Sequence, residues 1–319
     1  MRIVKISFVK IKQTTLHPIH AQLNARFIEF SGVDMPLWYA SAKAEHMAVR
    51  NSAGMFDISH MGMLLIDASD AATQFLQRVC TNDVQKTRPN AIIYTMILNQ
   101  NGGVLEDAMV GFNPTLNAYF LVINAANKQK MMTWFKQHGL DALSVDTRFE
   151  SHALLAIQGP QAIDTLRGVF DVDWDQLNRF QSQVFGYEST NCVIMRTGYT
   201  GEDGVEVSCP NAVVPDMWAA LRDAGVQPCG LAARDSLRIE AGLPLYGHEL
   251  SEQVTPLSTR YPWVLKWGTG FIGESALQAI KDQNDQTTKE INASDTRRVT
   301  VGLRFASRCL PRQGMAISE

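Results

Sequence analysis

Apolar residues follow two spacings along the chain, and each spacing predicts a different kind of element. In five segments they recur every three or four residues, which predicts helices, and a glycine follows most of these segments. The five are 41–51, 70–80, the segment that carries Met131, Trp134 and Phe135, 216–224 and 231–241. Pro160 is expected to open a further helix as its first residue.

Short apolar runs, several of them alternating with polar residues, predict strands. These runs are 56–63 (a loop that leads into a strand), 92–98, 104–112, 119–124, 153–158, 193–195 and 205–208. The turn 99–103 ends in two glycines and predicts a hairpin. Because helices mix with antiparallel hairpins, without regular alternation of strand and helix, the pattern predicts an α+β fold rather than a doubly wound sheet.

The segment 196–206, RTGYTGEDGVE, combines three glycines, a tyrosine and three acids. It predicts two strands joined by a glycine-rich loop, with Asp203-Gly204 as the turn. Val205 and Val207 then share one face of the second strand, and Glu206 lies on the other. The glycine spacing does not match a dinucleotide fingerprint or a phosphate loop. We interpret the segment as a rigid corner that holds a ligand; a tight hairpin with solvated acids is the alternative.

The segment 102–110, GGVLEDAMV, places two acids in an apolar strand. Strict alternation puts Asp107 on the face of Leu105 and Met109, and Glu106 on the opposite face. A buried carboxylate must be paired, hydrogen-bonded or functional, and its pKa rises in a cleft. Alternation alone does not choose between the two acids, and a strand edge where both meet water is the alternative.

Four further positions are candidates for ligand contacts. Arg234 and Arg238 share a helix face, and if Asp235 pairs with Arg238, then Arg234 is free to bind an acidic group. The alternative is a solvated basic face. Asn124, at a strand end, could hydrogen-bond a ring or cap the next helix. Tyr94 and His60 are weaker candidates, and His60 alone is typical of a structural histidine.

Composition excludes several classes of function. The chain has 319 residues, 45% of them hydrophobic, and a net charge of −3, which argues against binding nucleic acid or an anionic membrane. No apolar run is long enough to span a membrane. The N-terminal stretch does not read as a secretory signal and supports a mitochondrial presequence only weakly. The five cysteines are scattered without a CxxC pair, so we expect free thiols and no metal site.

No nucleophilic triad can be argued from order or spacing, which suits a substrate that supplies its own nucleophile. Taken together, the segments resemble the aminomethyltransferase (T-protein) family of the glycine cleavage system. The matching segments are EFSGVDMP (29–36), AEHMAVRNSAGMFDISHMG (44–62), TND (81–83), GGVLEDAMV (102–110), VINAAN (122–127), IQGP (157–160), RTGYTGEDGVEV (196–207), GLAARDSLRIEAGLPLYG (230–247) and FIG (271–273).

The resemblance implies a three-lobed cloverleaf around a hole that holds tetrahydrofolate as co-substrate. It implies transfer of a methylene group from an aminomethylated lipoyl arm on the H-protein to tetrahydrofolate, with release of ammonia. The other glycine cleavage components would be partners. The compartment would be the cytoplasm, or the mitochondrial matrix in a eukaryote. The alternatives are another folate-dependent one-carbon enzyme of the demethylase type and a non-catalytic folate-binding relative.

The resemblance also implies residue roles. The second acid of the family's GG-x-x-[DE]-D motif is Asp107, which would stabilise positive charge as the C–S bond breaks. The cofactor-binding residues would be Glu206 and Tyr199 on the pterin, Arg234 on a polar end, and Asn124, Met61 and Tyr94 in the pocket wall.

The chain departs from the family pattern at Val33, at Glu106 and over 258–262. The expected organisation is a folate-binding region of two interleaved lobes over 16–280, a polar linker over 281–298, and the first strands of a C-terminal β-barrel over 299–319. The barrel is expected to be shortened in this chain, with exposed strand edges.

Overall fold

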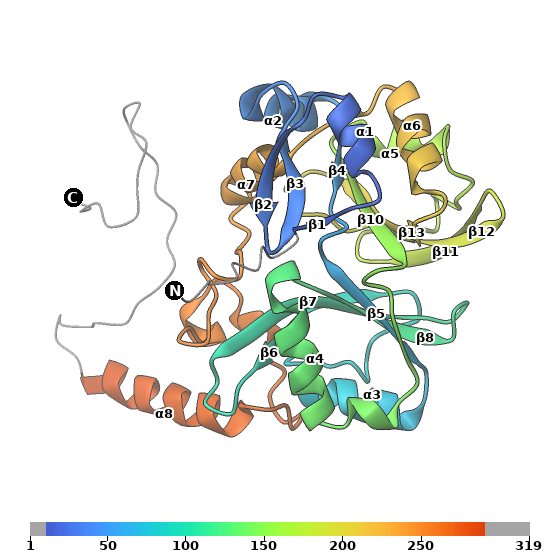
Figure 1. The fold of residues 1–319 in the computed structure, drawn as a ribbon. Coiled ribbons are helices and arrows are strands. Elements are labelled where there is room, and N and C mark those ends of the chain that lie inside the picture. The colour runs from blue at the N-terminus through green and yellow to red at the C-terminus, as the bar shows by residue number, and fades with distance from the viewer. Residues whose placement is uncertain (1–10, 291–319) are drawn as a thin grey trace, which may run out of the picture.

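The computed structural model describes residues 11–290, which form two lobes built on sheets and a C-terminal segment packed beside them (Figure 1). The chain begins in the upper lobe, passes through the lower lobe and returns to the upper lobe. Within the described range the architecture is α+β with antiparallel and mixed sheets, and it contains no closed barrel. The predicted fold class is confirmed at this level; residues 299–319 lie outside the described range.

The upper lobe contains a six-stranded sheet in the order β11-β12-β13-β10-β4-β14 and a small sheet in the order β1-β3-β2. The strands are β11 Ser182–Tyr187, β12 Thr190–Met195, β13 Gly204–Pro210, β10 His152–Gln158, β4 Gly54–Asp57, β14 Gln227–Pro228, β1 Lys12–Gln13, β3 Val33–Trp38 and β2 Arg26–Phe30. The helices are α1 His17–Gln22, α2 Ala42–Asn51, α5 Ala162–Arg167, α6 Val214–Asp223 and α7 Leu231–Glu240.

The six-stranded sheet is covered on both faces. Val205 and Val207 pack with residues of α5 and α6 in one core cluster. The other face packs against α2 and α7, which contribute Val49, Ala233 and Leu237 to a second cluster. Glu206 lies between the two valines on β13, so it projects to the side of α2 and α7. The predicted division of this strand into two faces is confirmed.

The lower lobe contains an antiparallel sheet in the order β6-β7-β8-β5-β9. Its elements are β6 Ile92–Leu98, β7 Val104–Asn113, β8 Ala118–Ile123, β5 Gly62–Asp67, β9 Val145–Thr147, α3 Asp70–Val79 and α4 Lys128–Gln137. One face packs against α3 and α4. The opposite face contributes Met63, Leu65 and Phe120 to the cluster that also contains the inner face of the upper sheet. The two sheets therefore face each other across a shared core.

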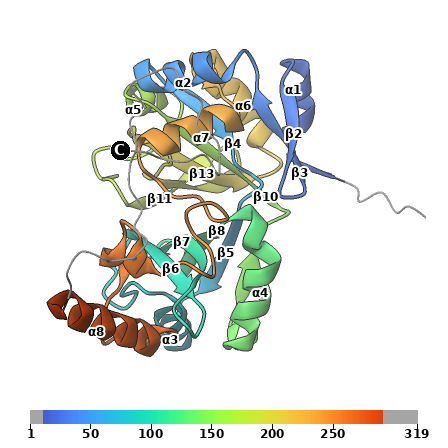
Figure 2. The ribbon, with the colours of Figure 1, turned by 90° about the vertical axis from the view of Figure 1, so that its left-hand side faces the viewer.

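The C-terminal segment contains two short 3-10 helices and a long helix, and it packs against the β6–β7 hairpin (Figure 2). These are η3 Pro256–Ser258, η4 Pro262–Val264 and α8 Glu274–Glu290. Leu250, Val264, Phe271 and Leu277 form a core cluster with residues of β6 and β7. At the turn of this hairpin, a Cβ on Gly103 would lie 1.9 Å from the carbonyl oxygen of Glu252, so only glycine allows the contact.

Several sequence-based boundaries differ from the structure. Helix α8 continues to Glu290, so the first part of the expected linker 281–298 is helical. Pro160 lies in a turn, and α5 begins at Ala162. The hairpin between β12 and β13 is closed by the loop 196–203 rather than by a two-residue turn, and Gly204 is already part of β13. Residues 56–63 contain the end of β4, a short loop and the start of β5. Most other predicted helices and strands agree with the structure to within two residues.

A β-bulge in β7 corrects the predicted face of Leu105, while the two acids lie on opposite faces as predicted. Glu106 pairs with Ile97, but Val104 rather than Leu105 pairs with Leu98, so Leu105 is the extra residue. Leu105 consequently packs in the lower-lobe core with Ala108, on the side of Glu106. Asp107 pairs with Met96 and shares the opposite face, which looks toward the upper lobe.

Candidate functional site

The loop 196–203 is a rigid corner, as predicted. Arg196 binds Asp203 through two contacts, of 2.7 and 3.2 Å, and donates to the carbonyl oxygen of Leu177. The buried side chain of Gln158 donates to the carbonyl oxygen of Thr197 and accepts a hydrogen bond of 2.9 Å from the hydroxyl of Thr200. These bonds fix both ends of the loop against β10.

The glycines of this loop serve its internal packing. A Cβ on Gly198 would lie 1.8 Å from Oε1 of Gln158, and a Cβ on Gly204 would lie 2.2 Å from the carbonyl oxygen of Ile157. On Gly201 a Cβ would lie 2.9 Å from Cβ of Ala241. These glycines therefore have a structural reason: a larger residue would clash with Gln158, with the backbone of β10 or with the end of α7.

Arg50 of α2 joins this loop to α7. It donates to the carbonyl oxygen of Thr200 at 2.7 Å and to the carboxylate of Glu202 at 2.9 Å. Its second terminal nitrogen donates to the carbonyl oxygen of Leu237 and to the carboxylate of Glu240 at 2.9 Å. The position of the loop is thereby coupled to the helix that carries Arg234.

Tyr199, Arg234 and Glu206 form the upper side of the candidate site. The guanidinium of Arg234 lies 4.6 Å from the centroid of the Tyr199 ring, a cation–π distance. The Tyr199 hydroxyl donates to the carbonyl oxygen of Pro244 at 2.5 Å. Glu206 accepts a hydrogen bond of 2.6 Å from the hydroxyl of Thr197, and its charge acts on Arg234.

Arg234 has a buried donor without a partner. Its Nη1 atom makes no hydrogen bond to any residue of the described range, and burial lowers the pKa of the guanidinium. In contrast, Arg238 is bound by Asp235 and Glu249, each at 2.9 Å. The predicted pairing of Arg238 with Asp235 is confirmed. A buried N–H donor without a partner, such as Nη1 of Arg234, is costly unless a ligand group completes it.

Asp107 is the centre of a hydrogen-bond network on the lower side. Its two carboxylate oxygens accept hydrogen bonds from the hydroxyl of Tyr94 at 3.0 Å and from the side-chain amide of Asn124 at 2.8 Å. The same amide donates to Glu106 at 2.5 Å. Tyr94 of β6 and Asn124, which directly follows β8, therefore hold the carboxylate of Asp107 on β7 in place. Asn124 makes no side-chain cap to the following helix.

Burial shifts the pKa values of both acids upward. It raises the pKa of Asp107 to about 6, and the hydrogen bonds from Tyr94 and Asn124 oppose the shift. Burial, together with the charge of Asp107, raises the pKa of Glu106 to about 8. Burial and the charge of Asp107 also raise the pKa of Tyr94, which therefore stays a hydrogen-bond donor. At neutral pH the pair carries about one negative charge.

The upper and lower sides of the site lie within electrostatic reach of each other. The charge of Asp107 acts on Tyr199 of the opposite lobe, and Tyr199 acts on Tyr94. The structure therefore brings together an acid, aromatic rings and a free guanidinium from segments far apart in the sequence. Met61, in the loop before β5, is half-buried against the core that joins the lobes.

The structure defines the surroundings of His60, a weak candidate from the sequence, and of two aromatic residues that the sequence analysis did not select. His60 is buried with its Nδ1 unpaired, and burial followed by the charge of Arg234 lowers its pKa to about 3, so it is neutral. Tyr261 and Trp263 were not predicted, yet their rings lie 5.8 and 6.0 Å from that of Tyr94. The two aromatic residues stand two positions apart in the sequence, which could have marked them. The segment 258–262 differs from the family pattern, so the resemblance did not point to them.

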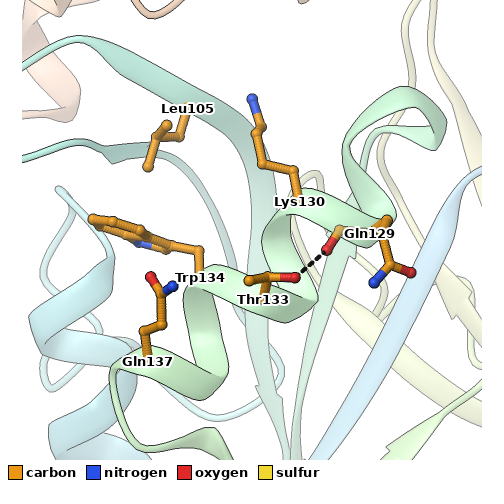
Figure 3. A pocket seen from close by; sticks show the side chains of 6 residues that line it. All are labelled: Leu105, Gln129, Lys130, Thr133, Trp134 and Gln137. Atoms are coloured by element: carbon orange, nitrogen blue, oxygen red, sulfur yellow. Dashed lines mark hydrogen bonds between the residues drawn. The ribbon is translucent and has the colours of Figure 1, made fainter.

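A separate cavity of about 460 Å³ lies on the other side of β7 (Figure 3). Leu105, Lys130 and Trp134 surround it, and the dashed line in Figure 3 joins Thr133 to the backbone of Gln129. The bulge turns Leu105 toward this cavity and Asp107 away from it. The cavity contains no acid and does not belong to the site around Asp107.

Three findings on the described residues concern metal ligands, cysteines and membrane-spanning helices. Residues 11–290 contain no group of three or more histidine, cysteine or acidic residues that could hold a metal ion. The four cysteines in that range, Cys80, Cys192, Cys209 and Cys229, are free and buried. No helix among the described residues has the length and apolar character needed to cross a bilayer.

Comparison with known proteins defines the class. The sequence profile described as the GCVT N-terminal domain matches residues 16–269. The crystal structure of glycine cleavage system aminomethyltransferase T from Bartonella henselae matches with a TM-score of 0.78 and 31% identity, over 85% of this chain and 75% of that chain. Fold and sequence together therefore define an enzyme of the transferase class.

Two curated relatives identify the family. An aminomethyltransferase of Caldanaerobacter subterraneus subsp. tengcongensis is 39% identical over 98% of this chain and 82% of its own length. That of Chlorobium phaeobacteroides is 40% identical over 95% of this chain and 81% of its own length. The chain belongs to the GCVT family of aminomethyltransferases, and the resemblance predicted from sequence is confirmed.

Proposed function

We propose that this chain is the aminomethyltransferase of a glycine cleavage system. It takes the methylene group of an aminomethylated lipoyl arm on the H-protein and transfers it to tetrahydrofolate. The C–S bond to the lipoyl sulfur and the C–N bond to the departing ammonia break, and two bonds from the methylene carbon to the folate nitrogens form. The family match and the names of the relatives support this function.

The residues of the site fit a folate between the lobes. Its pterin is planar and rich in N–H donors, and the Glu206 carboxylate suits those donors because it can accept a pair of them. The unpaired Nη1 of Arg234 needs an acceptor, which a folate carbonyl or carboxylate provides. Because the Tyr199 hydroxyl is bound to Pro244, we assign Tyr199 a contact through its ring and a role in holding Arg234. Met61, Tyr94 and Asn124 form the wall around the central hole of a cloverleaf.

Asp107 carries the chemistry, and the observation that supports this most directly is its hydrogen-bond network. Tyr94 and Asn124 bind the carboxylate from two sides, so the charge is oriented before the substrate arrives. An oriented charge in a partly desolvated site stabilises the cationic methylene group that develops as the C–S bond breaks. Asp107 therefore acts as an electrostatic partner, and the folate nitrogen is the nucleophile.

Ammonia release tests the function. We expect the protein to release ammonia from an aminomethylated lipoyl H-protein only when tetrahydrofolate is present, with 5,10-methylenetetrahydrofolate formed in equal amount. A free N-methyl or S-methyl compound should not replace the carrier. Turnover of such a compound would instead support a demethylase, and folate binding without turnover of any donor would indicate a non-catalytic relative.

We also propose that the protein works in the cytoplasm.

A further inference from the structure

Glu106, the neighbour of Asp107, occupies an unusual environment for an acid. Its side chain is 0% exposed. Its Oε1 atom accepts hydrogen bonds from the backbone N–H of Asp107, the backbone N–H of Asn124 and the side-chain amide of Asn124, at 3.2, 3.2 and 2.5 Å. Its Oε2 atom is buried and makes no hydrogen bond to any residue of the range 11–290.

The bulge at Leu105 places Glu106 on the apolar side of the sheet. Glu106 pairs with Ile97, which belongs to the core beneath α3 and α4. The charged group that acts on it is Asp107, while the backbone and the side-chain amide of Asn124 donate hydrogen bonds to it. No lysine, arginine or histidine within residues 11–290 forms an ion pair with Glu106. An ionised carboxylate with an unpaired oxygen would be costly in this core, whereas a neutral acid is tolerated.

Asn124 links the two acids. Its side-chain nitrogen donates to Glu106 Oε1 at 2.5 Å, to Asp107 Oδ1 at 2.8 Å and to the backbone carbonyl oxygen of Asp107 at 3.1 Å, so the amide bridges the two acids. Because both partners are acceptors, the amide must present its nitrogen to them. Glu106 also binds the backbone N–H of Asn124, which fixes the residue at both ends. Removal of Glu106 would leave Asn124 held only through its side-chain bonds to Asp107, without the contacts that fix its backbone N–H and the other side of its amide.

We propose that Glu106 is a positioning residue: as a neutral acid it clamps Asn124 and the backbone of Asp107, so that Asp107 carries the negative charge of the pair and faces the ligand. The kinetic part of this inference rests on the proposed function of Asp107. The protonation state of Glu106 can be measured without an activity assay. If the proposed function proves wrong, the protonation state of Glu106 is still tested independently, and the reverse also holds.

Infrared spectroscopy of glutamate-labelled protein tests the protonation state. We expect a band of a protonated, buried carboxyl group at pH 7 that is absent in Glu106→Gln. It should disappear as pH rises through about 8. In Asp107→Asn the same band should titrate at higher pH than an exposed glutamate but at lower pH than in the wild type, because the charge of Asp107 is gone. Absence of a protonated band at pH 7, or its persistence in Glu106→Gln, would overturn the proposal.

Kinetics test the positioning role with a matched pair of variants. Glu106→Gln keeps an acceptor for Asn124 and should lower kcat by less than about tenfold, whereas Glu106→Ala should lower kcat about 100-fold with the KM for tetrahydrofolate within about threefold. Activity of the wild type should fall as Glu106 ionises above pH 8, and Glu106→Gln should lack this fall.

Two controls keep the kinetic test decisive. Circular dichroism and thermal melting establish that Glu106→Ala is folded; if it is not, the pH profile of Glu106→Gln is the deciding measurement. In a folded Glu106→Ala, the further loss caused by Asn124→Ala should be small, because both substitutions release the same contact. Equal losses in Glu106→Gln and Glu106→Ala, or an alkaline fall that persists in Glu106→Gln, would contradict the positioning role.

Discussion

At the scale of single residues, the site separates a chemical role from a binding role. Asp107 is held by Tyr94 and Asn124, which are both hydrogen-bond donors. Arg234 lies against the face of Tyr199 and within reach of the charge of Glu206, and its Nη1 makes no hydrogen bond to any residue of the described range. A fully satisfied acid is oriented before any ligand binds, whereas a buried unsatisfied cation gains most from the ligand. We therefore assign charge stabilisation to the first and affinity to the second.

The pH dependence of turnover follows from the pKa of Asp107. Its pKa of about 6 means that the carboxylate is formed as the pH rises from 5 to 7. Because only the ionised form stabilises a cation, kcat/KM should rise with an apparent pKa near 6. A pH profile of ammonia release checks this. The residual activity of Asp107→Asn should lack that rise, and a wild-type profile that is flat between pH 5 and 7 would contradict the assignment.

A second buried acid controls stability rather than chemistry. The carboxylate of Asp57 accepts hydrogen bonds from His20 at 3.0 Å and from Thr14 at 2.7 Å, and the hydrogen bond from His20 lowers its pKa despite burial. A folded pKa below the unfolded value of 3.8 means that stabilisation is present above that value. It is lost as the pH falls through the folded pKa.

Asp57→Asn should therefore lower Tm at pH 7, by about 5 °C or more, because breaking a buried pair costs about 3–5 kcal/mol. The difference from the wild type should shrink toward pH 3. Thermal melts across this range provide the measurement, with the exposed Asp67→Asn as the matched control. A difference that is the same at pH 3 and pH 7 would show that Asp57 acts through packing alone.

At the scale of elements, periodicity predicted most helices and strands but not the features that position the site. Helix α7 and strand β13 were predicted from their apolar spacing. The pairing of Arg238 with Asp235 was predicted from their separation of three residues on that helix. The bulge at Leu105 did not, because an extra residue in a strand leaves the apolar pattern almost unchanged. It moves Leu105 from the face of Asp107 to the face of Glu106, and only the pairing register reveals it.

The loop 196–203 shows the same limit. Its glycines were correctly associated with a rigid corner, but their reason lies in Gln158 on β10, nearly forty residues earlier in the chain. Close approach of distant segments leaves no local signal in the sequence. The roles of Asp107, Glu206 and Arg234 came from the family resemblance, since spacing alone left the acids of β7 undecided.

Arg50 is the test of how strongly α2 controls this loop. Arg50→Met removes its hydrogen bonds to Thr200, Glu202 and Glu240 while keeping the length of the side chain. Hydrogen exchange within 196–203 should become faster, and the Kd for tetrahydrofolate should rise about tenfold because the loop carries Tyr199. Arg26→Met, an exposed arginine on β2, is the control. Unchanged exchange and affinity would mean that Gln158 alone fixes the loop.

At the scale of the whole molecule, two sheets face each other and each contributes one function. The upper sheet and α7 present Glu206 and Arg234, and the lower sheet presents Asp107. The shared core between them, which includes Phe56 and Phe120, fixes their separation. The C-terminal segment adds Tyr261 and Trp263 beside Tyr94. A ligand held between the lobes would therefore meet the binding groups and the chemical group from opposite sides.

The central claim is this separation of roles, and one paired measurement tests it. Single-turnover ammonia release and the Kd for tetrahydrofolate are measured on Asp107→Asn and Glu206→Gln, with the exposed Asp171→Asn as control. We predict that Asp107→Asn slows release about 100-fold or more with Kd within threefold. Glu206→Gln should raise Kd about tenfold or more and slow release at saturating folate by less than tenfold. Normal release by Asp107→Asn, or an unchanged Kd in Glu206→Gln, would contradict the account.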